Sequence, residues 1–290
     1  MRAGFIGLGI MGRGMAGNLL KKGIGLAVCN RTAERAAPFA ERGAVVCASP
    51  AAVAADCDIV GICVTDGAAV EEVVRGLRPA LRPGQYVVDH STISPEQARR
   101  LAADVARTGA EMLDAPVTGG DRGAAAGTLT IMVGGSAEAF SAVRPYLEAV
   151  GKKIVHVGGS GQGQLVKLVN NFIGGIAMAG AAEGLLLGLR GGVPLATMME
   201  VLSAGSAASV SLQLLADRLA RGDFAPGFSL ANRLKDMELA LETARGLAAD
   251  TPVGAVATDI FRGRRAEGEG DLDQTVLMRH YLGRIEGPVG

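Results

Sequence analysis

A lysine and an asparagine four residues apart, Lys167 and Asn171, are the side chains of this sequence best suited to acid–base chemistry. Four residues make about one turn of an α-helix, so the two side chains project from one face. The stretch from Leu165 to Ile173 is otherwise mostly apolar, and an ammonium group in a partly desolvated cleft can exchange protons near neutral pH. The spacing leaves a second interpretation open, in which Lys167 extends into solvent and the neighbouring asparagines cap a loop.

Glycines near the N-terminus match the pattern that binds the phosphates of a dinucleotide, G-x-G-x-x-G. With 43 glycines in the chain, chance alone supplies about one such match, and Gly12-x-Gly14-x-x-Gly17 also fits. Only the earlier match follows an expected strand and opens an expected helix, which is the context that phosphate binding requires. The alternative is a glycine-rich turn without a ligand. We therefore predict cofactor contacts at Gly7, Leu8, Gly9, Ile10, Met11 and Gly12.

The type of dinucleotide is predicted from the residues at the end of the second expected strand, Asn30, Arg31 and Thr32. An NAD-specific site usually has a carboxylate at this place, which accepts hydrogen bonds from the ribose. Arg31 instead can neutralise a 2′-phosphate, while Asn30 and Thr32 can donate hydrogen bonds to it. The loop therefore favours NADP, with NADPH as the preferred form, and leaves open an enzyme that also accepts NAD.

Short β-branched runs alternate with helical patterns through the first half of the chain, beginning with a strand at 3–7 and a helix at 11–22. Strands that alternate with helices of about 10–15 residues are typical of βαβ units around a parallel sheet. Further strands are expected at residues 26–29, 44–47, 58–64, 86–89 and 111–114, with 128–133 and 153–157 extending the sheet.

No segment beyond residue 160 resembles a strand. Helical patterns follow one another instead, at residues 165–190, 196–202, 212–219, 230–247 and 253–261. The predicted fold class is α/β, with an N-terminal Rossmann-type doubly wound sheet followed by an all-helical C-terminal domain. We expect an NADP-binding domain at 1–160, and at 161–290 an all-α substrate and dimerisation domain that starts with a long interdomain helix.

The composition excludes several classes of partner, since 29 Lys and Arg balance 29 Asp and Glu. A neutral chain gives no electrostatic reason to expect nucleic acid or an anionic membrane. The most apolar stretch, 172–189, is interrupted by Glu183 and is expected to be a buried helix. Four cysteines without a C-x-x-C pair favour free thiols and a cytoplasmic location, and no secretory signal is expected. The three histidines lack metal-ligand spacing, so no metal site is predicted.

Four motifs occur in the order that they have in the β-hydroxyacid dehydrogenases, and the chain resembles this family over nearly its whole length. The family includes 3-hydroxyisobutyrate dehydrogenase, tartronate semialdehyde reductase and the glyoxylate/succinic semialdehyde reductases. The motifs are Gly7-Leu8-Gly9-Ile10-Met11-Gly12, Asp114-Ala115-Pro116-Val117-Thr118-Gly119-Gly120, Gly161-x-Gly163-x-x-x-Lys167-x-x-Asn170-Asn171 and Lys235-Asp236.

The resemblance implies roles for individual residues. Lys167 is the acid/base and Asn171 orients the substrate, whose carboxylate is held by Thr118, Gly119 and Gly120. Thr118 replaces the commoner serine and keeps its hydroxyl. Arg122 is a candidate for a second carboxylate, although a solvated loop arginine is the alternative. The resemblance also implies cofactor contacts at Val64 and Thr65, where the family usually has Leu-Pro, and at Thr92 and Lys235; a solvated helix lysine is the alternative for Lys235.

The function implied is that of an NADP-dependent 3-hydroxyacid dehydrogenase or semialdehyde reductase. Its substrate would be succinic, tartronate or methylmalonate semialdehyde, or glyoxylate, interconverted with the corresponding hydroxy acid. The alternatives are an enzyme like the imine reductases and a non-catalytic dinucleotide-binding scaffold. Imine reductases generally replace the lysine, and the intact Lys167/Asn171 pair disfavours a scaffold. The apolar, alanine-rich second domain predicts a homo-oligomer, either a dimer or a tetramer.

Overall fold

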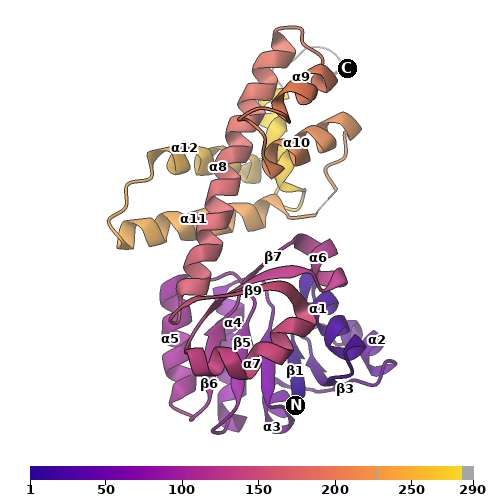
Figure 1. Ribbon diagram of the computed structural model, residues 1–290, viewed down its shortest axis with the longest axis vertical. Helices are drawn as coiled ribbons and strands as arrows, with labels where there is room; N and C mark the ends of the chain where they lie inside the picture. The colour runs from indigo at the N-terminus through magenta and orange to yellow at the C-terminus, as the bar shows by residue number, and fades with distance from the viewer. Residues whose placement is uncertain (226, 283–290) are drawn as a thin grey trace. The chain divides into compact units, whose positions relative to one another are not determined.

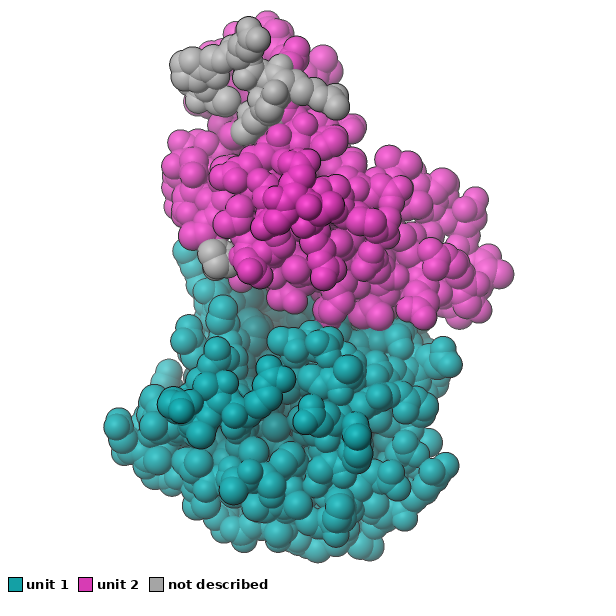
Figure 2. Space-filling view, turned by 180° about the vertical axis from the view of Figure 1, so that it is seen from behind, with its two compact units in different colours: residues 1–167 teal, residues 168–290 magenta. Residues whose placement is uncertain are grey.

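The computed structural model describes residues 1–225 and 227–282 (Figure 1). The chain divides into two compact units, residues 1–167 and residues 168–290 (Figure 2). Strands belong to the first unit and helices make up the described part of the second, so the predicted fold class is confirmed. The division between the units falls within one long helix, α8 (Gln162–Arg190).

The first unit is built on one sheet in which neighbouring strands follow the order β3-β2-β1-β4-β5-β6-β8-β7, with β9 paired to β8. The six strands from β3 to β6 are parallel, and the order reverses direction between β1 and β4, where doubly wound sheets bind their ligands. The strands are β1 (Arg2–Ile6), β2 (Gly25–Cys29), β3 (Val45–Val46), β4 (Ile59–Ile62), β5 (Tyr86–Asp89), β6 (Glu111–Asp114), β7 (Val117–Thr118), β8 (Leu129–Gly134) and β9 (Gly151–Gly158).

The last part of the sheet differs from the all-parallel arrangement that alternating strands and helices suggested. Strand β8 runs antiparallel to β6 and to the short strand β7, and parallel to β9. The segment between β6 and β8 contributes β7 to the same sheet, so the chain must reverse direction before β8. Antiparallel neighbours accept such a short connection, whereas parallel neighbours need a longer crossover.

Different helices bury the two faces of this sheet, because side chains alternate along each strand. Phe5 and Val88 lie in the core formed with α1 and α7, whereas Ile6 and Val87 lie in the core formed with α3, α4 and α5. The helices of the first unit are α1 (Ile10–Lys21), the 3₁₀ turn η1 (Ala33–Ala36), α2 (Ala37–Ala40), α3 (Pro50–Asp56), α4 (Gly67–Leu77), η2 (Arg78–Ala80), α5 (Pro95–Ala106), α6 (Gly120–Ala126) and α7 (Ala137–Val150).

The second unit packs the remainder of α8 with shorter helices around its own core, which includes Leu185, Met237 and Phe261. Ser229 caps α11, and the Asp273 carboxylate accepts hydrogen bonds that fix the loop before it. Its other elements are α9 (Leu195–Leu202), α10 (Val210–Arg221), α11 (Leu230–Gly246), α12 (Pro252–Ala266), η3 (Gln274–Met278) and α13 (Arg279–Leu282).

Helix α8 is more exposed than the sequence predicts. Among the described residues it is the one helix long and apolar enough to suit a membrane span, and 28% of its apolar window is buried inside the chain. The exposed apolar side chains Val169, Ile173 and Leu187 recur on one side of the helix, with exposed fractions of 48%, 61% and 77%. The helices packed on α8 within residues 1–225 and 227–282 therefore leave an apolar stripe uncovered.

Candidate active site

The glycine-rich loop joins β1 to α1, and two of its glycines are required by packing within the first unit. Gly7 has φ +97°, and a β-carbon there would overlap with the carbonyl oxygen of Cys63. A β-carbon at Gly12 would overlap with the carbonyl oxygen of Gly7. Ile10 and Met11 start α1 between them. These two glycines let the first turn of α1 pack directly against the end of the sheet.

Gly9 differs from both, because a β-carbon there would meet no protein atom within 4 Å. It is also the N-cap residue of α1, so no side chain caps the first amides of that helix. The loop is held in place by the Leu8 N–H, which donates to Oδ1 of Asn30 at 2.8 Å. Open space beside uncapped helix amides fits the pyrophosphate of a dinucleotide.

The loop after β2 carries the residues predicted to select the cofactor. The side chain of Asn30 is used within the unit, since its Oδ1 binds the glycine loop and its Nδ2 donates to the carbonyl oxygen of Thr32 at 2.8 Å. Arg31 and Thr32 are exposed. Asn30 thus braces two loops, and Arg31 and Thr32 are the side chains that this loop presents to solvent.

Val64 and Thr65 follow β4, at the same end of the sheet as the glycine loop. The Val64 N–H donates to Oγ of Ser91 at 3.0 Å, which ties this segment to the one that follows β5. The Thr65 hydroxyl donates to the Asp66 carboxylate at 3.2 Å, and Asp66 caps α4 by accepting from the Ala69 N–H at 2.9 Å. The two residues at the place of the family's Leu-Pro, Val64 and Thr65, are therefore followed directly by a helix cap, Asp66.

Thr92 is half-buried, and the main chain on both sides of it is bound by the side chain of Gln164. Gln164 Nε2 donates to the carbonyl oxygen of Ser91 at 2.8 Å, and Oε1 accepts from the N–H of Ile93 at 3.2 Å. Gln164 lies in the first turn of α8 and is 0% exposed. Sequence reasoning missed this residue, because a single glutamine at the start of a helix forms no distinctive pattern.

Asp114, at the end of β6, binds the start of α8. Its carboxylate is buried and accepts hydrogen bonds from the N–H groups of Gly161 at 2.7 Å and Gln164 at 2.9 Å. Burial raises the pKa of Asp114 above its usual value, while these backbone hydrogen bonds act in the opposite direction. A residue 47 positions before Gly161 therefore caps the helix.

The residues predicted to hold the substrate carboxylate follow Asp114 directly. Thr118 ends the short strand β7 and is half-buried. Gly119 and Gly120 are exposed and have φ values of +131° and +65°, which side chains rarely permit. Arg122 is exposed on α6. The turn directly after β7 is thus a backbone conformation that depends on glycine.

Lys167 and Asn171 lie one turn apart on α8 and are 8% and 4% exposed. Lys167 therefore does not extend into solvent, which was the alternative that its spacing had left open. Gly163 allows the helix to begin where it does, because a β-carbon there would lie 2.5 Å from the carbonyl oxygen of Met132 and 2.8 Å from the Asp114 carboxylate.

The second unit holds Asn171 through residues that sequence reasoning had not assigned to it. Asn171 Nδ2 donates to Asp236 at 2.5 Å, and its Oδ1 accepts from Asn170 at 3.0 Å. The Arg233 guanidinium donates to the Asn171 carbonyl oxygen at 2.5 Å, and burial lowers the pKa of Arg233 to about 10. Lys235 forms an ion pair with Asp236 at 3.1 Å, so Asn171 and Lys235 share one carboxylate.

Burial disfavours the charged forms of His90 and of the four cysteines, lowering the pKa of the histidine and raising the pKa of each thiol. Burial lowers the pKa of His90 to about 4, and its ring nitrogens lie 2.8 Å from the carbonyl oxygen of Ala115 and 3.0 Å from the Tyr146 hydroxyl. Burial also raises the pKa of Cys63 to about 12. The four cysteines are free thiols, and among residues 1–225 and 227–282 no cluster of His, Cys, Asp and Glu could hold a metal ion.

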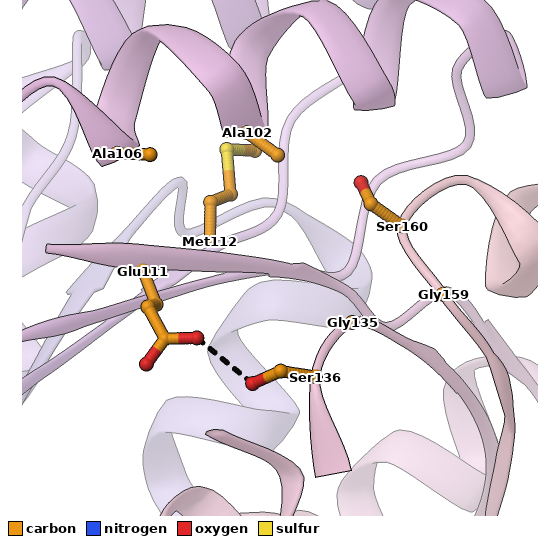
Figure 3. A pocket seen from close by; sticks show the side chains of 8 residues that line it. All are labelled: Ala102, Ala106, Glu111, Met112, Gly135, Ser136, Gly159 and Ser160. Carbon is orange, nitrogen blue, oxygen red and sulfur yellow. Dashed lines mark hydrogen bonds between the residues drawn. The ribbon is translucent and has the colours of Figure 1, made fainter. Parts of the chain in front are cut away.

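A pocket of about 270 Å³ lies elsewhere in the first unit, between α5, the start of β6 and the loops that follow β8 and β9 (Figure 3). Met112 and Glu111 project in different directions from β6, and the Ser136 hydroxyl donates to the Glu111 carboxylate at 2.8 Å. None of the predicted site residues is among those that line it, which are Ala102, Ala106, Glu111, Met112, Gly135, Ser136, Gly159 and Ser160.

Comparison with known proteins gives matches over both units. The profile of the NAD-binding domain of 6-phosphogluconate dehydrogenase matches residues 2–158. The profile described as NAD-binding of NADP-dependent 3-hydroxyisobutyrate dehydrogenase matches residues 161–281.

Individual relatives are similar over nearly the whole chain. The 2-(hydroxymethyl)glutarate dehydrogenase of Eubacterium barkeri is 39% identical over 96% of this chain and 94% of its own. The 2-hydroxy-3-oxopropionate reductase of Escherichia coli is 38% identical over 96% of both chains. The structure of Mycobacterium tuberculosis 3-hydroxyisobutyrate dehydrogenase with L-serine has a TM-score of 0.89 and 32% identity, covering 97% of this chain and 99% of that one. The chain therefore belongs to the β-hydroxyacid dehydrogenase family of NAD(P)-dependent oxidoreductases.

Proposed function

We propose that this chain interconverts a small carboxylate-bearing semialdehyde and the corresponding hydroxy acid, with NADPH as the preferred reductant. The observation that carries the proposal is Lys167, a buried lysine one helical turn ahead of Asn171, whose amide is oriented by Asp236. A buried ammonium beside a fixed amide suits proton transfer to a developing alkoxide.

The residues have distinct parts in the proposed reaction. Lys167 donates a proton to the carbonyl oxygen during reduction and takes it back during oxidation. Asn171 can orient the substrate because Asp236 and Asn170 fix its side-chain amide. Thr118, Gly119 and Gly120 bind the carboxylate, and Arg122 binds a second carboxylate where the substrate has one. The bound nicotinamide supplies or accepts the hydride at the carbonyl carbon.

We assign the cofactor to the first unit because the loops after β1 and β2 suit the phosphate groups of a dinucleotide. Gly9 leaves open the space that a pyrophosphate needs, and the exposed Arg31 and Thr32 provide a cation and a hydroxyl for a 2′-phosphate. Val64, Thr65 and Thr92 follow β4 and β5 at the same end of the sheet, and Lys235 is assigned to the cofactor from the second unit. We assign dinucleotide binding to residues 1–160, and substrate binding and dimerisation to residues 161–290.

The substrates proposed are succinic, tartronate and methylmalonate semialdehyde and glyoxylate, because each offers a carbonyl group and a carboxylate on a short chain. One of the relatives is named for the reduction of 2-hydroxy-3-oxopropionate, and another for the dehydrogenation of a hydroxy diacid. These names support a small oxo acid or hydroxy acid as the substrate class proposed for this chain. A panel of these compounds, run with both cofactors, would identify the member that this chain prefers.

Self-association is proposed from the uncovered stripe of α8. Val169, Ile173 and Leu187 are exposed along one side of this helix, and Gly180 and Gly184 lie between them at positions where a β-carbon would meet no atom within 4 Å. A second copy of the chain would bury such a stripe, as closed homo-oligomers commonly do. Sedimentation should give two or four times the chain mass of 29.5 kDa, and a monomer at micromolar concentration would contradict the proposal.

Replacing the acid/base tests the catalytic proposal most directly. We expect Lys167→Ala to lower turnover of the preferred semialdehyde by about 10²–10⁴-fold, because proton transfer is worth that much in rate. Consumption of NADPH is followed at 340 nm, and binding of NADPH and NADH is titrated separately. The variant should still bind NADPH, and the unchanged protein should bind NADPH more tightly than NADH.

Lys153→Ala is the matched control, since Lys153 is an exposed lysine on β9. This variant should keep its turnover. Turnover close to that of the unchanged protein in Lys167→Ala would overturn the assignment of the acid/base.

A further inference from the structure

Two buried glutamines, Gln85 and Gln164, bind the main chain at opposite ends of β5. They differ in how far along the chain their partners lie. Gln85, before the strand, donates to the carbonyl oxygens of Ala54 and Cys57, both at 2.6 Å. These contacts close loops within the first ninety residues. Gln164, beyond the strand, binds both sides of Thr92 from a position more than seventy residues later in the chain.

The contacts of Gln164 fix the segment around Thr92 as a neighbouring strand would. Its side-chain N–H donates to the Ser91 carbonyl oxygen and its side-chain oxygen accepts from the Ile93 N–H, so Thr92 cannot move without breaking a buried hydrogen bond. Ser91 in turn accepts from the Val64 N–H at 3.0 Å. Two of the predicted cofactor contacts, Val64 and Thr92, are therefore linked to one side chain of α8.

The backbone of Gln164 is also held by hydrogen bonds. The Gln164 N–H donates to the Asp114 carboxylate at 2.9 Å, and that carboxylate also accepts from the Gly161 N–H. Gly163 lies so close to Asp114 and Met132 that a β-carbon would not fit. These contacts hold the first turn of α8 against the end of β6, and Lys167 follows Gln164 by three residues on the same side of the helix.

We propose that Gln164 is a positioning residue that sets the place of the acid/base Lys167 relative to the cofactor contacts Thr92 and Val64. The inference rests on the proposed function, because it needs Lys167 as the proton donor. Small displacements of a catalytic group lower the rate of the chemical step far more than they lower ligand affinity. Gln164 itself touches neither substrate nor cofactor in this proposal.

Gln164→Leu tests the proposal by removing both side-chain hydrogen bonds at nearly constant volume. We expect kcat per folded enzyme to fall by about tenfold to hundredfold, while the Kd for NADPH changes by less than about threefold. The primary isotope effect with deuterated NADPH should be at least as large as that of the unchanged protein, because the chemical step is the one slowed. Gln85→Leu is the matched control, since Gln85 is 3% exposed and equally well bonded.

Gln164→Glu provides a readout that a purely structural role would not change. A protonated glutamic acid has the shape of glutamine, with one oxygen to accept from Ile93 and one hydroxyl to donate to Ser91. An ionised carboxylate cannot donate to Ser91. The charged groups around this turn are two buried carboxylates, Asp114, which accepts from the residue 164 N–H, and Asp89, which accepts from the Ser91 N–H, with Arg99 and Lys167 as the cations. Relative to the unchanged protein, kcat of this variant should recover as the pH is lowered from about 8 to about 5.5.

The outcomes separate this inference from the proposed function. Gln164→Leu and Gln85→Leu with equal kcat per folded enzyme, or a Gln164→Glu variant whose relative kcat does not depend on pH, would overturn the positioning role alone. Hydrogen exchange adds a measurement independent of turnover, since the Ile93 amide should exchange faster in Gln164→Leu and not in Gln85→Leu. If the Lys167→Ala variant keeps its turnover, the proposed function is wrong and this role is lost with it.

Discussion

Two overlapping glycine patterns with identical spacing lie in this chain, and they serve different purposes. The first, Gly7 to Gly12, follows β1 and has one member, Gly9, whose missing side chain leaves open space. The second, Gly12 to Gly17, lies inside α1. There, a β-carbon at Gly14 would come within 2.7 Å of the backbone of Ala124 in α6. Its central glycine thus serves helix packing.

The comparison shows that a glycine motif can be interpreted only once it is known which atoms a side chain at each position would meet. A glycine whose β-carbon would meet protein backbone is required by the fold. A glycine with a negative φ whose β-carbon would meet nothing is required neither by packing nor by the backbone conformation, so a functional requirement there comes from a ligand or a partner chain. In this chain Gly12 belongs to the first kind and Gly9 to the second, although they are three residues apart. Substitutions by alanine separate the two kinds.

The largest effect is expected at Gly12, followed by Gly14. Gly12→Ala places a methyl group on the carbonyl oxygen of Gly7 and should lower the free energy of unfolding by about 3 kcal/mol or more. Gly14→Ala should lower it by about 1–2 kcal/mol, because overpacking against α6 is partly offset by the better helix propensity of alanine. Denaturant unfolding of both variants measures these values.

Gly17→Ala is the control for these two variants, since its β-carbon would lie an ordinary 3.5 Å from the Arg42 guanidinium. It should be as stable as the unchanged protein or slightly more so. The ranking would be wrong if Gly14→Ala proved no less stable than Gly17→Ala.

A smaller effect on stability, with a clear effect on binding, is expected at Gly9. Gly9→Ala should leave the free energy of unfolding within about 0.5 kcal/mol, because the backbone there has φ −70° and the β-carbon meets no atom. NADPH affinity should fall at least about tenfold, since the methyl group would occupy the space assigned to the pyrophosphate. Undiminished NADPH affinity in this variant would place the pyrophosphate somewhere else.

Much of the fold could be predicted from local patterns. The expected strands at 86–89 and 111–114 agree with β5 and β6, and the expected helix at 230–247 agrees with α11 to within one residue. Short apolar runs preceded by turn residues identified the two strands, and a long stretch of good helix formers identified the helix. The short strand β7 and helix α6 were not predicted, because two residues and seven residues are too few to carry a period.

The candidate site was predictable only in part. Lys167 and Asn171 stood out because polar residues in an apolar helix require an explanation. Gln164 and Arg233 did not, since their partners lie about 70 and 60 residues away along the chain. Asn30 was predicted to donate hydrogen bonds to a 2′-phosphate; in the structure its side-chain oxygen accepts from the Leu8 N–H and its side-chain nitrogen donates to the Thr32 carbonyl oxygen. Contacts between residues so far apart in the chain produce no short sequence motif that could reveal them.

The sequence by itself determined most of the order of strands and helices, the place of the glycine-rich turn after the first strand and the one-turn spacing of Lys167 and Asn171, because these depend on neighbours a few residues apart. Only the tertiary structure decided which glycine leaves room for a ligand, which carboxylate caps α8 and which side chain holds Thr92. Those are questions about atoms that meet in space, and their answers exist only once the sheet has brought the ends of its strands together.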